Sequence, residues 1–182
     1  MTDLPVTGGA QPQQPYLIEP LGKQHDRATF TCGSEPLDRY FKTQVTQDIR
    51  RRVAKCMVAI DVATSAVGGF YTLSAMSLAL AEIPDTLTKG LPRYPILPVV
   101  LMGRLAVATK AQGHKLGTAL LAHAVEYVAT GNIGAFALVI DAKDDVAQRF
   151  YERHGFVAIT GHPRRLILPL ESALRAIKVG GR

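Results

Sequence analysis

The feature of this sequence that most limits its possible folds is an almost unbroken apolar run, Val99–Val107, followed by a glycine-bearing turn and a helix. Such a run is typical of a strand buried on both faces, which needs neighbouring strands and covering helices. The helix carries mostly apolar and aromatic residues at helical spacing from Leu116 to Tyr127, and a second apolar run, Phe136–Ile140, follows it. This succession of strand, helix and strand predicts a crossover connection.

Hydrophobic periodicity and turn residues predict further elements on both sides of the crossover. One helix is expected from Glu35-Pro36, after Ser34, with the apolar stripe Leu37, Phe41, Val45 and Ile49. Another is expected after Asp144 or Asp145, with Val146, Phe150 and Tyr151 on its inward side. The other expected strands are Tyr16–Ile18, the hairpin Cys56–Val62 and Val67–Ser77, Phe156–Ile159 and Arg165–Leu170, and residues 82–98 form an irregular proline-rich segment. This order predicts an α/β or α+β domain around one mixed sheet.

Composition and charge exclude several classes of protein. The 182 residues suffice for one domain, expected at 16–178 after a disordered lead at 1–15. Two cysteines exclude a disulfide scaffold and stand in no metal-binding spacing. No apolar run approaches the ~20 residues of a membrane span, and no secretory signal is present, so we expect a cytoplasmic protein without metal. With 21 basic and 15 acidic residues, the net charge of +6 favours an anionic partner such as nucleic acid, a phosphate cofactor or an anionic membrane.

The turn Gln112–Thr118 is the segment best suited to hold a ligand. It opens a helix, whose first turn presents unpaired backbone N–H groups and the positive end of the helix dipole to an anion such as a pyrophosphate. Gly113 and Gly117 remove side chains where a ligand would approach, and Lys115 adds a positive charge. From spacing alone, an equally good interpretation is that Gly113 only turns the chain and Gly117 only lets the helix pack closely.

Two segments give the sequence a family resemblance. The stretch from Gln112 to Gly117 resembles the phosphate loop of the GNAT acetyltransferases, Gln/Arg-x-x-Gly-x-Gly/Ala, with Lys115 in place of the central glycine. The stretch from Phe150 to Phe156 resembles their FYxxxGF segment. The resemblance implies the GNAT acyl-CoA N-acyltransferase fold, a central mixed, mostly antiparallel sheet flanked by helices. A lysine can supply the backbone amide of the replaced glycine if its φ is negative.

Within that superfamily, the sequence resembles the acetyltransferase toxins of type II toxin–antitoxin systems over about residues 17–170. The resemblance is carried by Phe30–Gly33, Leu37–Tyr40, Leu91–Pro95 and Gly103–Val107. Those toxins use acetyl-CoA to acetylate the amino group of aminoacyl-tRNA and thereby halt translation. The resemblance also implies a homodimer and neutralisation by a cognate antitoxin, usually a ribbon-helix-helix protein.

The same resemblance implies roles for individual residues. The pantetheine arm of acetyl-CoA would pair with the strand edge Leu105, Ala106 and Val107, and its pyrophosphate would bind Gln112, Gly113, His114, Lys115, Leu116, Gly117 and Thr118. Tyr151 matches the residue that donates a proton to the departing sulfur, although a tyrosine on the inward side of a helix is otherwise a core residue. Asp141 ends a strand beside the expected groove, where it is equally a turn residue. Arg93 would contact the acceptor stem of tRNA.

The choice of acceptor depends on charge and on the absence of a base. Arg50, Arg51 and Arg52 end the first predicted helix, where they either contact tRNA phosphates or form a solvated helix end. The strand at 98–107 contains no Asp, Glu or His. An α-amino group, with a reference pKa of about 7.7–8.0, is substantially neutral at cellular pH without a base, whereas lysine at about 10.4 is not, so an α-amine acceptor is favoured. Two other functions stay open: acetylation of a small amine or protein N-terminus, and nucleic-acid binding by a basic module without catalysis, which Lys115 favours.

Overall fold

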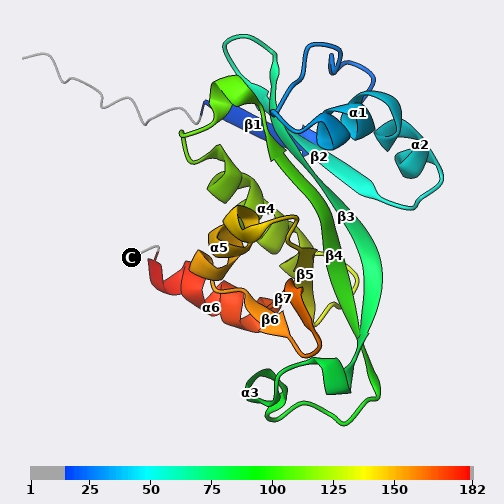
Figure 1. The fold of residues 1–182 in the computed structure, drawn as a ribbon, viewed down its shortest axis with the longest axis vertical. Coiled ribbons are helices and arrows are strands. Elements are labelled where there is room, and N and C mark those ends of the chain that lie inside the picture. Colours follow the sequence, from blue (N-terminus) through cyan, green and yellow to red (C-terminus); the bar gives the residue numbers. More distant parts are fainter. Residues whose placement is uncertain (1–14, 181–182) are drawn as a thin grey trace, which may run out of the picture.

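The computed structural model describes residues 15–180, with side chains to Arg175, as one sheet with helices on both faces (Figure 1). The strands are β1 (Tyr16–Pro20), β2 (Lys55–Asp61), β3 (Val67–Ala79), β4 (Ile96–Val107), β5 (Ala137–Asp141), β6 (Val157–Ile159) and β7 (His162–Pro169). The helices are α1 (Glu35–Thr43), α2 (Val45–Arg50), α3 (Asp85–Thr88), α4 (Leu116–Ala129), α5 (Asp145–Arg153) and α6 (Leu170–Gly180), with short 3₁₀ turns η1 (Leu80–Glu82) and η2 (Thr109–Ala111). Apart from Pro15, the predicted lead at 1–15 lies outside the described residues.

The strands follow the order β1-β2-β3-β4-β5-β7-β6 across the sheet. β4 and β5 are parallel, and the other neighbouring pairs are antiparallel. This arrangement confirms the predicted mixed, mostly antiparallel sheet and the predicted crossover, in which α4 connects the two parallel strands. The long, curved hairpin of β3 and β4 runs the length of the molecule and carries both halves of the sheet (Figure 1).

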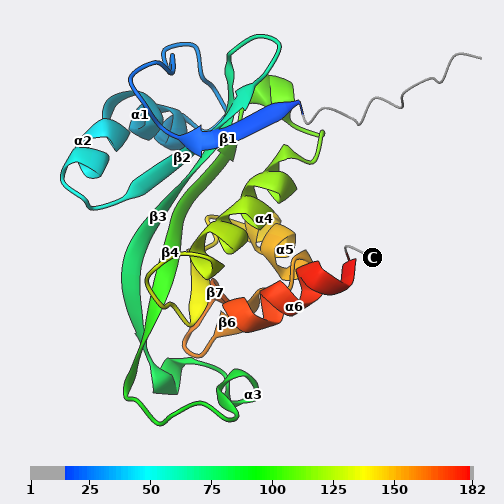
Figure 2. The same cartoon turned by 180° about the vertical axis from the view of Figure 1, so that it is seen from behind.

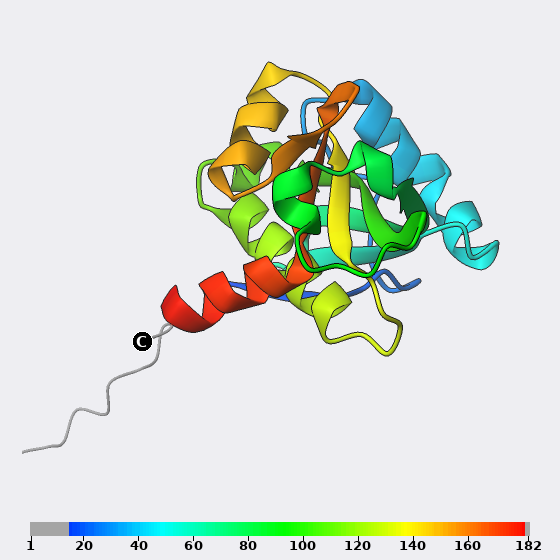
Figure 3. The same cartoon turned by 90° about the horizontal axis from the view of Figure 1, so that it is seen from below.

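The two faces of the sheet are covered by different helices (Figures 1 and 2). The helices α4, α5 and α6 cover one face, where the buried side chains include Leu120, Leu138 and Leu166. On the opposite face, α1 and α2 lie over an aromatic cluster in which Phe41 stacks on Phe70 with ring centroids 4.2 Å apart. A separate apolar cluster lies near the other end of the sheet and is covered by the segment 80–95, which faces the viewer when the domain is seen from below (Figure 3).

The structure corrects several details of the predicted elements, among them the segment 82–98, which contains α3 and the start of β4 at Ile96. The helix expected from Glu35 is interrupted at Gln44, although Phe41 and Val45 of its predicted stripe are fully buried. Leu170 begins α6 instead of ending a strand. Val146, expected to face inward, is 68% exposed, because α5 turns Tyr151 toward the core and leaves Val146 on its outer side.

Candidate active site

The two parallel strands separate near the middle of β4. Val99–Met102 pairs with Ala137–Ile140, but β4 continues to Val107 while β5 ends at Asp141. Among the described residues, the edge of Gly103–Val107 that turns away from β3 therefore has no partner strand. We call this edge the β4–β5 opening. An unpaired strand edge can accept another extended chain by backbone hydrogen bonding.

The ladder between β3 and β4 decides which amides face the opening. Just past β4, the N–H of Ala108 donates to the carbonyl of Gly68 at 2.8 Å. Along a strand, the backbone N–H and C=O groups of successive residues point alternately to one side and to the other. Since the groups of Ala108 point to β3, those of Ala106 do so too, whereas those of Leu105 and Val107 point to the opening. Of the three predicted strand-edge residues, Leu105 and Val107 are thus placed to bind an amide-bearing arm. The methyl group of Ala106 is buried in the aromatic cluster.

The predicted turn Gln112–Thr118 follows this strand edge directly. The side-chain amide Nε2 of Gln112 donates to the carbonyl of Val107 at 3.1 Å and to that of Cys32 at 3.0 Å. Gly113 has a φ of 81°, a conformation that favours glycine. The turn is therefore fixed at the end of the β4–β5 opening by a side chain as well as by its backbone.

Lys115 departs from the conformation expected from the sequence. Its φ is 61° and its ψ is 12°, so the condition of a negative φ is not met. The lysine instead adopts the left-handed conformation that a glycine at this position would take, at a cost of about 1–2 kcal/mol. The backbone of the turn thus keeps the glycine-type path even though the glycine is replaced.

The N-terminus of α4 has the features expected of an anion site. Its first residues, Leu116, Gly117 and Thr118, carry backbone N–H groups without intrahelical acceptors, and the side chain of the N-cap residue Lys115 does not cap them. His114 and Lys115 are exposed beside them. A Cβ atom on Gly117 would approach Val107 no closer than 3.6 Å, which is ordinary contact. Helix packing therefore does not require this glycine, and the packing interpretation of Gly117 loses its basis.

The second predicted landmark, Tyr151, lies on α5 with only 8% of the residue exposed. It belongs to the same apolar cluster as Met102 and Leu116, and its ring meets Phe156 edge-on at 5.6 Å between centroids. Its hydroxyl makes no hydrogen bond to any residue between 15 and 175. Burial raises the pKa of Tyr151 to about 12, so the phenol is fully protonated at neutral pH and can donate a proton.

A hydrogen bond links the elements that carry the two landmarks. The hydroxyl of Thr118, in the first turn of α4, lies 3.2 Å from Nε2 of His154, which follows α5. The other ring nitrogen of His154 lies 2.7 Å from the carbonyl of Phe150. The helix that begins at the predicted phosphate turn and the helix that carries Tyr151 are therefore adjacent.

Two titratable groups near these elements, Asp141 and His123, are already engaged. Asp141 ends β5 at the opening, as predicted, and its carboxylate is bound by Arg165 of β7. His123 lies 2.8 Å from the hydroxyl of Tyr71, and burial lowers its pKa, which fits the expectation that it is packed and not catalytic.

The predicted tRNA-contacting arginines lie on two separate segments. Arg50 ends α2, Arg51 and Arg52 follow it, and all three are exposed. Arg93 is exposed in the segment between α3 and β4. The two views in Figures 1 and 2 place α2 and the α3 segment far apart along the β3–β4 hairpin, so the fold does not bring the two predicted groups together.

Arg104 lies in β4 at the opening and was not among the residues predicted for the site. Its guanidinium carbon stands 3.5 Å from the centroid of the Tyr40 ring. The signal that could have identified it is a charged residue inside an otherwise apolar strand.

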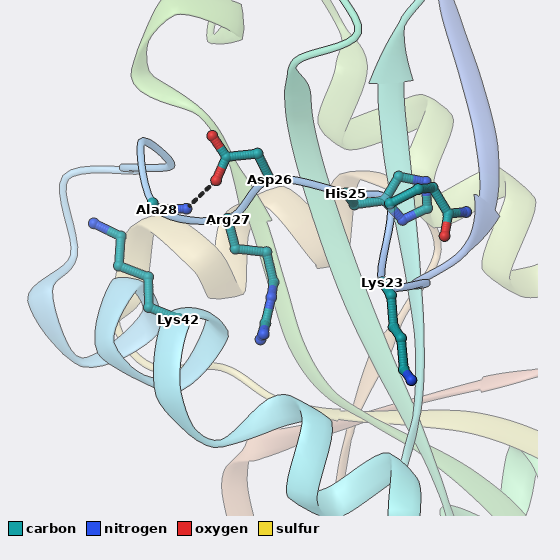
Figure 4. A pocket seen from close by; sticks show the side chains of 7 residues that line it. Lys23, His25, Asp26, Arg27, Ala28 and Lys42 are labelled. Carbon is teal, nitrogen blue, oxygen red and sulfur yellow. Dashed lines mark hydrogen bonds between the residues drawn. The ribbon is translucent and has the colours of Figure 1, made fainter.

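A pocket of about 660 Å³ lies elsewhere, between α1 and the segment 23–28 (Figure 4). Lys23, Arg27 and Lys42 line it, and none of the predicted site residues does. The Arg27 guanidinium donates to the carbonyl of Phe41 at 2.7 Å. This pocket is thus distinct from the β4–β5 opening.

Neither a membrane-spanning helix nor a metal cluster occurs in the described part of the chain. No helix between residues 15 and 180 is long and apolar enough to cross a bilayer. Over the same residues, no group of three or more His, Cys, Asp or Glu side chains is arranged to hold a metal ion.

Comparison with known proteins identifies this combination of fold and site. A model of the acetyltransferase (GNAT) domain matches residues 75–158, which contain the opening, the turn and Tyr151. The fold and site define a GNAT acetyltransferase. A curated relative, the tRNA-acetylating toxin of Mycobacterium tuberculosis (strain ATCC 25618 / H37Rv), is 32% identical over 150 residues, covering 81% of this chain and 88% of the relative. The chain belongs to the family of tRNA-acetylating GNAT toxins.

Solved structures agree with this assignment. A structure of AtaT complexed with acetyl-methionyl-tRNAfMet is 26% identical, with a TM-score of 0.82 over 89% of this chain and 99% of that chain. A structure of AtaTR bound with AcCoA is 26% identical, with a TM-score of 0.77 over 90% and 98%. A mutant of AtaT bound to the C-terminus of the antitoxin AtaR is 25% identical, with a TM-score of 0.77 over 90% and 98%.

Proposed function

We propose that this protein transfers an acetyl group from acetyl-CoA to the α-amino group of aminoacyl-tRNA and so blocks translation. The single observation that carries the proposal is the geometry of β4: its unpaired edge leads directly into the Gln112–Thr118 turn at the N-terminus of α4. The curated relative is a tRNA-acetylating toxin, and a solved structure holds AtaT complexed with acetyl-methionyl-tRNAfMet.

The residues of the opening fit acetyl-CoA. The backbone N–H and C=O of Leu105 and the N–H of Val107 would pair with the amides of the pantetheine arm, since the carbonyl of Val107 accepts from the side chain of Gln112. The amides of the turn, from Gly113 to Thr118, would bind the pyrophosphate, assisted by the charge of Lys115. Acetyl-CoA supplies an activated acetyl thioester, and backbone N–H groups at the strand edge would polarise its carbonyl.

Tyr151 would supply the proton that the departing sulfur takes up. A phenol is protonated at neutral pH even at its ordinary pKa of about 10, and the hydroxyl of Tyr151 is not engaged by another described side chain. Asp141 is held by Arg165, and it would contribute to the wall of the groove. An α-amine needs no strong base, because a substantial share is already neutral near pH 7.5.

The acceptor is proposed from charge and from the relatives. The net charge of +6 favours a polyanion over a small cationic amine, which would be repelled. We assign phosphate contacts to Arg50, Arg51 and Arg52 and contact with the acceptor stem to Arg93, which the structure presents on two separate surfaces. A charged tRNA is large enough to reach both.

We further propose that residues 16–178 act as a single domain, as a homodimer in the cytoplasm, where aminoacyl-tRNA is found. A cognate antitoxin, of the ribbon-helix-helix type, would neutralise it. The AtaT mutant bound to the C-terminus of AtaR supports a partner of this kind, since a segment of antitoxin binds that related toxin.

The direct test is incubation of the protein with charged tRNA and radiolabelled acetyl-CoA. Label should enter the α-amino group of the aminoacyl moiety, and Tyr151→Phe should lose most of this activity. Uncharged tRNA is the matched control, because it lacks the α-amine. Labelling of a small amine or a protein N-terminus in preference to charged tRNA would refute the proposed acceptor, and a lack of acetyl-CoA binding would leave only a nucleic-acid-binding module.

A further inference from the structure

Arg104 occupies a particular place in the strand that forms the opening. It lies two residues beyond Met102, the last residue of β4 that pairs with β5, so it is about 7 Å along the strand from the point where the strands separate. Thr72 of β3 pairs with Arg104 and Leu73 pairs with Met102, which leaves Gly103 as an extra, bulged residue. The bulge therefore lies directly beside the opening.

The bulge reverses the direction of the side chains that follow it. Before it, Val100 and Met102 belong to the core beneath α4. After it, Leu105 and Val107 take up that face, while Ala106 packs beneath α1. Without the extra residue, alternation along the strand would send Arg104 into the apolar core under α4. The bulge instead sends this charge to the opposite face.

Tyr40 holds the guanidinium of Arg104 in place without using its hydrogen-bond donors. The two groups stack at 3.5 Å, and the Tyr40 ring is 3% exposed. The hydroxyl of Tyr40 donates to a carboxylate oxygen of Asp48 at 2.9 Å, which anchors the ring. Within the described part of the chain, the Arg104 side chain makes no hydrogen bond and no ion pair. A stacked arginine of this kind is a fixed cation whose planar set of N–H donors is available to a ligand.

The face of the sheet to which Arg104 points indicates which ligand it would meet. The Gln112–Thr118 turn and Tyr151 belong to the α4 side of the sheet, so the acceptor must approach the opening from the other side. Arg104 projects to that other side. An aminoacyl-tRNA places its α-amine on the terminal nucleotide, and the nearest anion in its own structure is the 5′ phosphate of that nucleotide.

We propose that Arg104 binds an oxygen of this terminal phosphodiester and thereby positions the α-amine at the β4–β5 opening. The inference rests on the proposed function and deepens it, since it names the part of the acceptor that this residue recognises. Arginine suits this role because its guanidinium can form two parallel hydrogen bonds to a phosphate.

The test compares two acceptors that differ in phosphate. One is charged tRNA, and the other is an aminoacyl-nucleoside, which carries the same ester and α-amine without any phosphate. Arg104→Met keeps an apolar chain against Tyr40 but removes the charge, so kcat/KM for charged tRNA should fall by about 10- to 100-fold. Activity on the aminoacyl-nucleoside and the KM for acetyl-CoA should change less than about twofold. The slope of log kcat/KM for charged tRNA against log salt should become shallower by about one.

Two further variants separate a specific phosphate contact from a general effect of positive charge and from a loss of folding. Arg39→Met removes one exposed positive charge from α1, where Arg39 forms an ion pair with Glu35 at 3.5 Å, and should leave activity on both acceptors nearly unaffected. Arg104→Lys keeps the charge without the planar donor set and should recover part of the activity on charged tRNA. It also provides a folded variant, judged by its melting temperature, if the methionine variant is unstable.

The outcomes distinguish this inference from the proposed function. Equal losses on both acceptors in a folded Arg104 variant, or an equal loss from Arg39→Met, would overturn the phosphate contact while the acetylation of aminoacyl-tRNA stands. If the unsubstituted protein acetylates neither acceptor, the proposed function itself fails, and the inference fails with it. A loss confined to charged tRNA supports both.

Discussion

Arg165 holds the carboxylate of Asp141 through two hydrogen bonds, 2.6 Å from Nε to Oδ1 and 2.8 Å from an Nη nitrogen to Oδ2. The two residues face each other across the β5–β7 ladder at the end of the β4–β5 opening. The hydrogen bond to Asp141 raises the pKa of Arg165, so the guanidinium stays charged. A carboxylate held in this way is poorly suited to take a proton from an incoming amine.

The first prediction concerns this pair. Asp141→Asn should leave kcat for charged tRNA within about threefold of the original value, because the α-amine needs no carboxylate base. The free energy of unfolding should fall by no more than about 1 kcal/mol, since both side chains are partly exposed. Steady-state kinetics and urea denaturation measure the two quantities. A loss of more than about 100-fold at unchanged stability would identify Asp141 as a base.

The second prediction concerns Tyr151. Tyr151→Phe keeps the ring against Phe156 and removes only the hydroxyl, so kcat should fall by about 100- to 10,000-fold. Binding of acetyl-CoA should persist, and at 100 times Kd it should stabilise both proteins by about 2.7 kcal/mol, measured by thermal denaturation. Full activity in the phenylalanine variant would show that the proton comes from elsewhere.

The third prediction is the dependence of the rate on pH. The rate with charged tRNA should rise from pH 6 and level off above about pH 8, as the α-amine loses its proton. Because the pKa of Tyr151 is raised to about 12, this residue should cause no fall in rate up to pH 9. A descending limb between pH 7 and 9 in rapid-mixing measurements, corrected for ester hydrolysis, would contradict the role given to Tyr151.

The same pKa shift predicts a change in stability with pH. The folded protein retains the Tyr151 proton up to about pH 12, whereas the unfolded chain loses it near the reference value of about 10. This contribution to stability is therefore complete below pH 10 and is lost as the pH rises toward 12. Tyr151→Phe should show a smaller decline over that range in denaturation experiments, and an identical decline in both proteins would argue against the shift.

The fifth prediction concerns Lys115, whose φ of 61° is strained for a residue with a side chain. Lys115→Gly should raise the free energy of unfolding by up to about 1 kcal/mol, because it relieves this strain but adds freedom to the unfolded chain. Lys115→Ala keeps the strain and removes only the charge, so it should weaken acetyl-CoA binding severalfold without any gain in stability. Calorimetry and urea denaturation of the two variants separate the charge from the conformation. A glycine variant less stable than the alanine variant would contradict the strain.

The sequence predicted the crossover and both landmarks, because each is encoded locally. An unbroken apolar run, a glycine turn and a capped helix can be identified without knowing what packs against them, and the side chain of Asp144 does cap α5. The exposure of Val146 could not be predicted in the same way, since it depends on how α5 rotates against the sheet. The left-handed Lys115 likewise depends on the path imposed by the flanking strand and helix, which overrides the preference of lysine itself.

Arg104 could not be interpreted from the sequence for a related reason. Strand alternation alone would place it in the core, and only the pairing of β3 with β4 identifies the bulge at Gly103. The interruption at Gln44 and the start of α6 at Leu170 were likewise not predicted from the local pattern. The residue proposed to contact the acceptor is therefore harder to predict than those proposed to bind the cofactor, whose motif is continuous in the chain.

The side-chain amide of Gln112 joins the turn to the end of β4 and to the segment that leads into α1. One side chain thus links the turn beside the β4–β5 opening to the segment that leads into α1. Loss of this side chain should therefore loosen the turn and the Cys32 segment together.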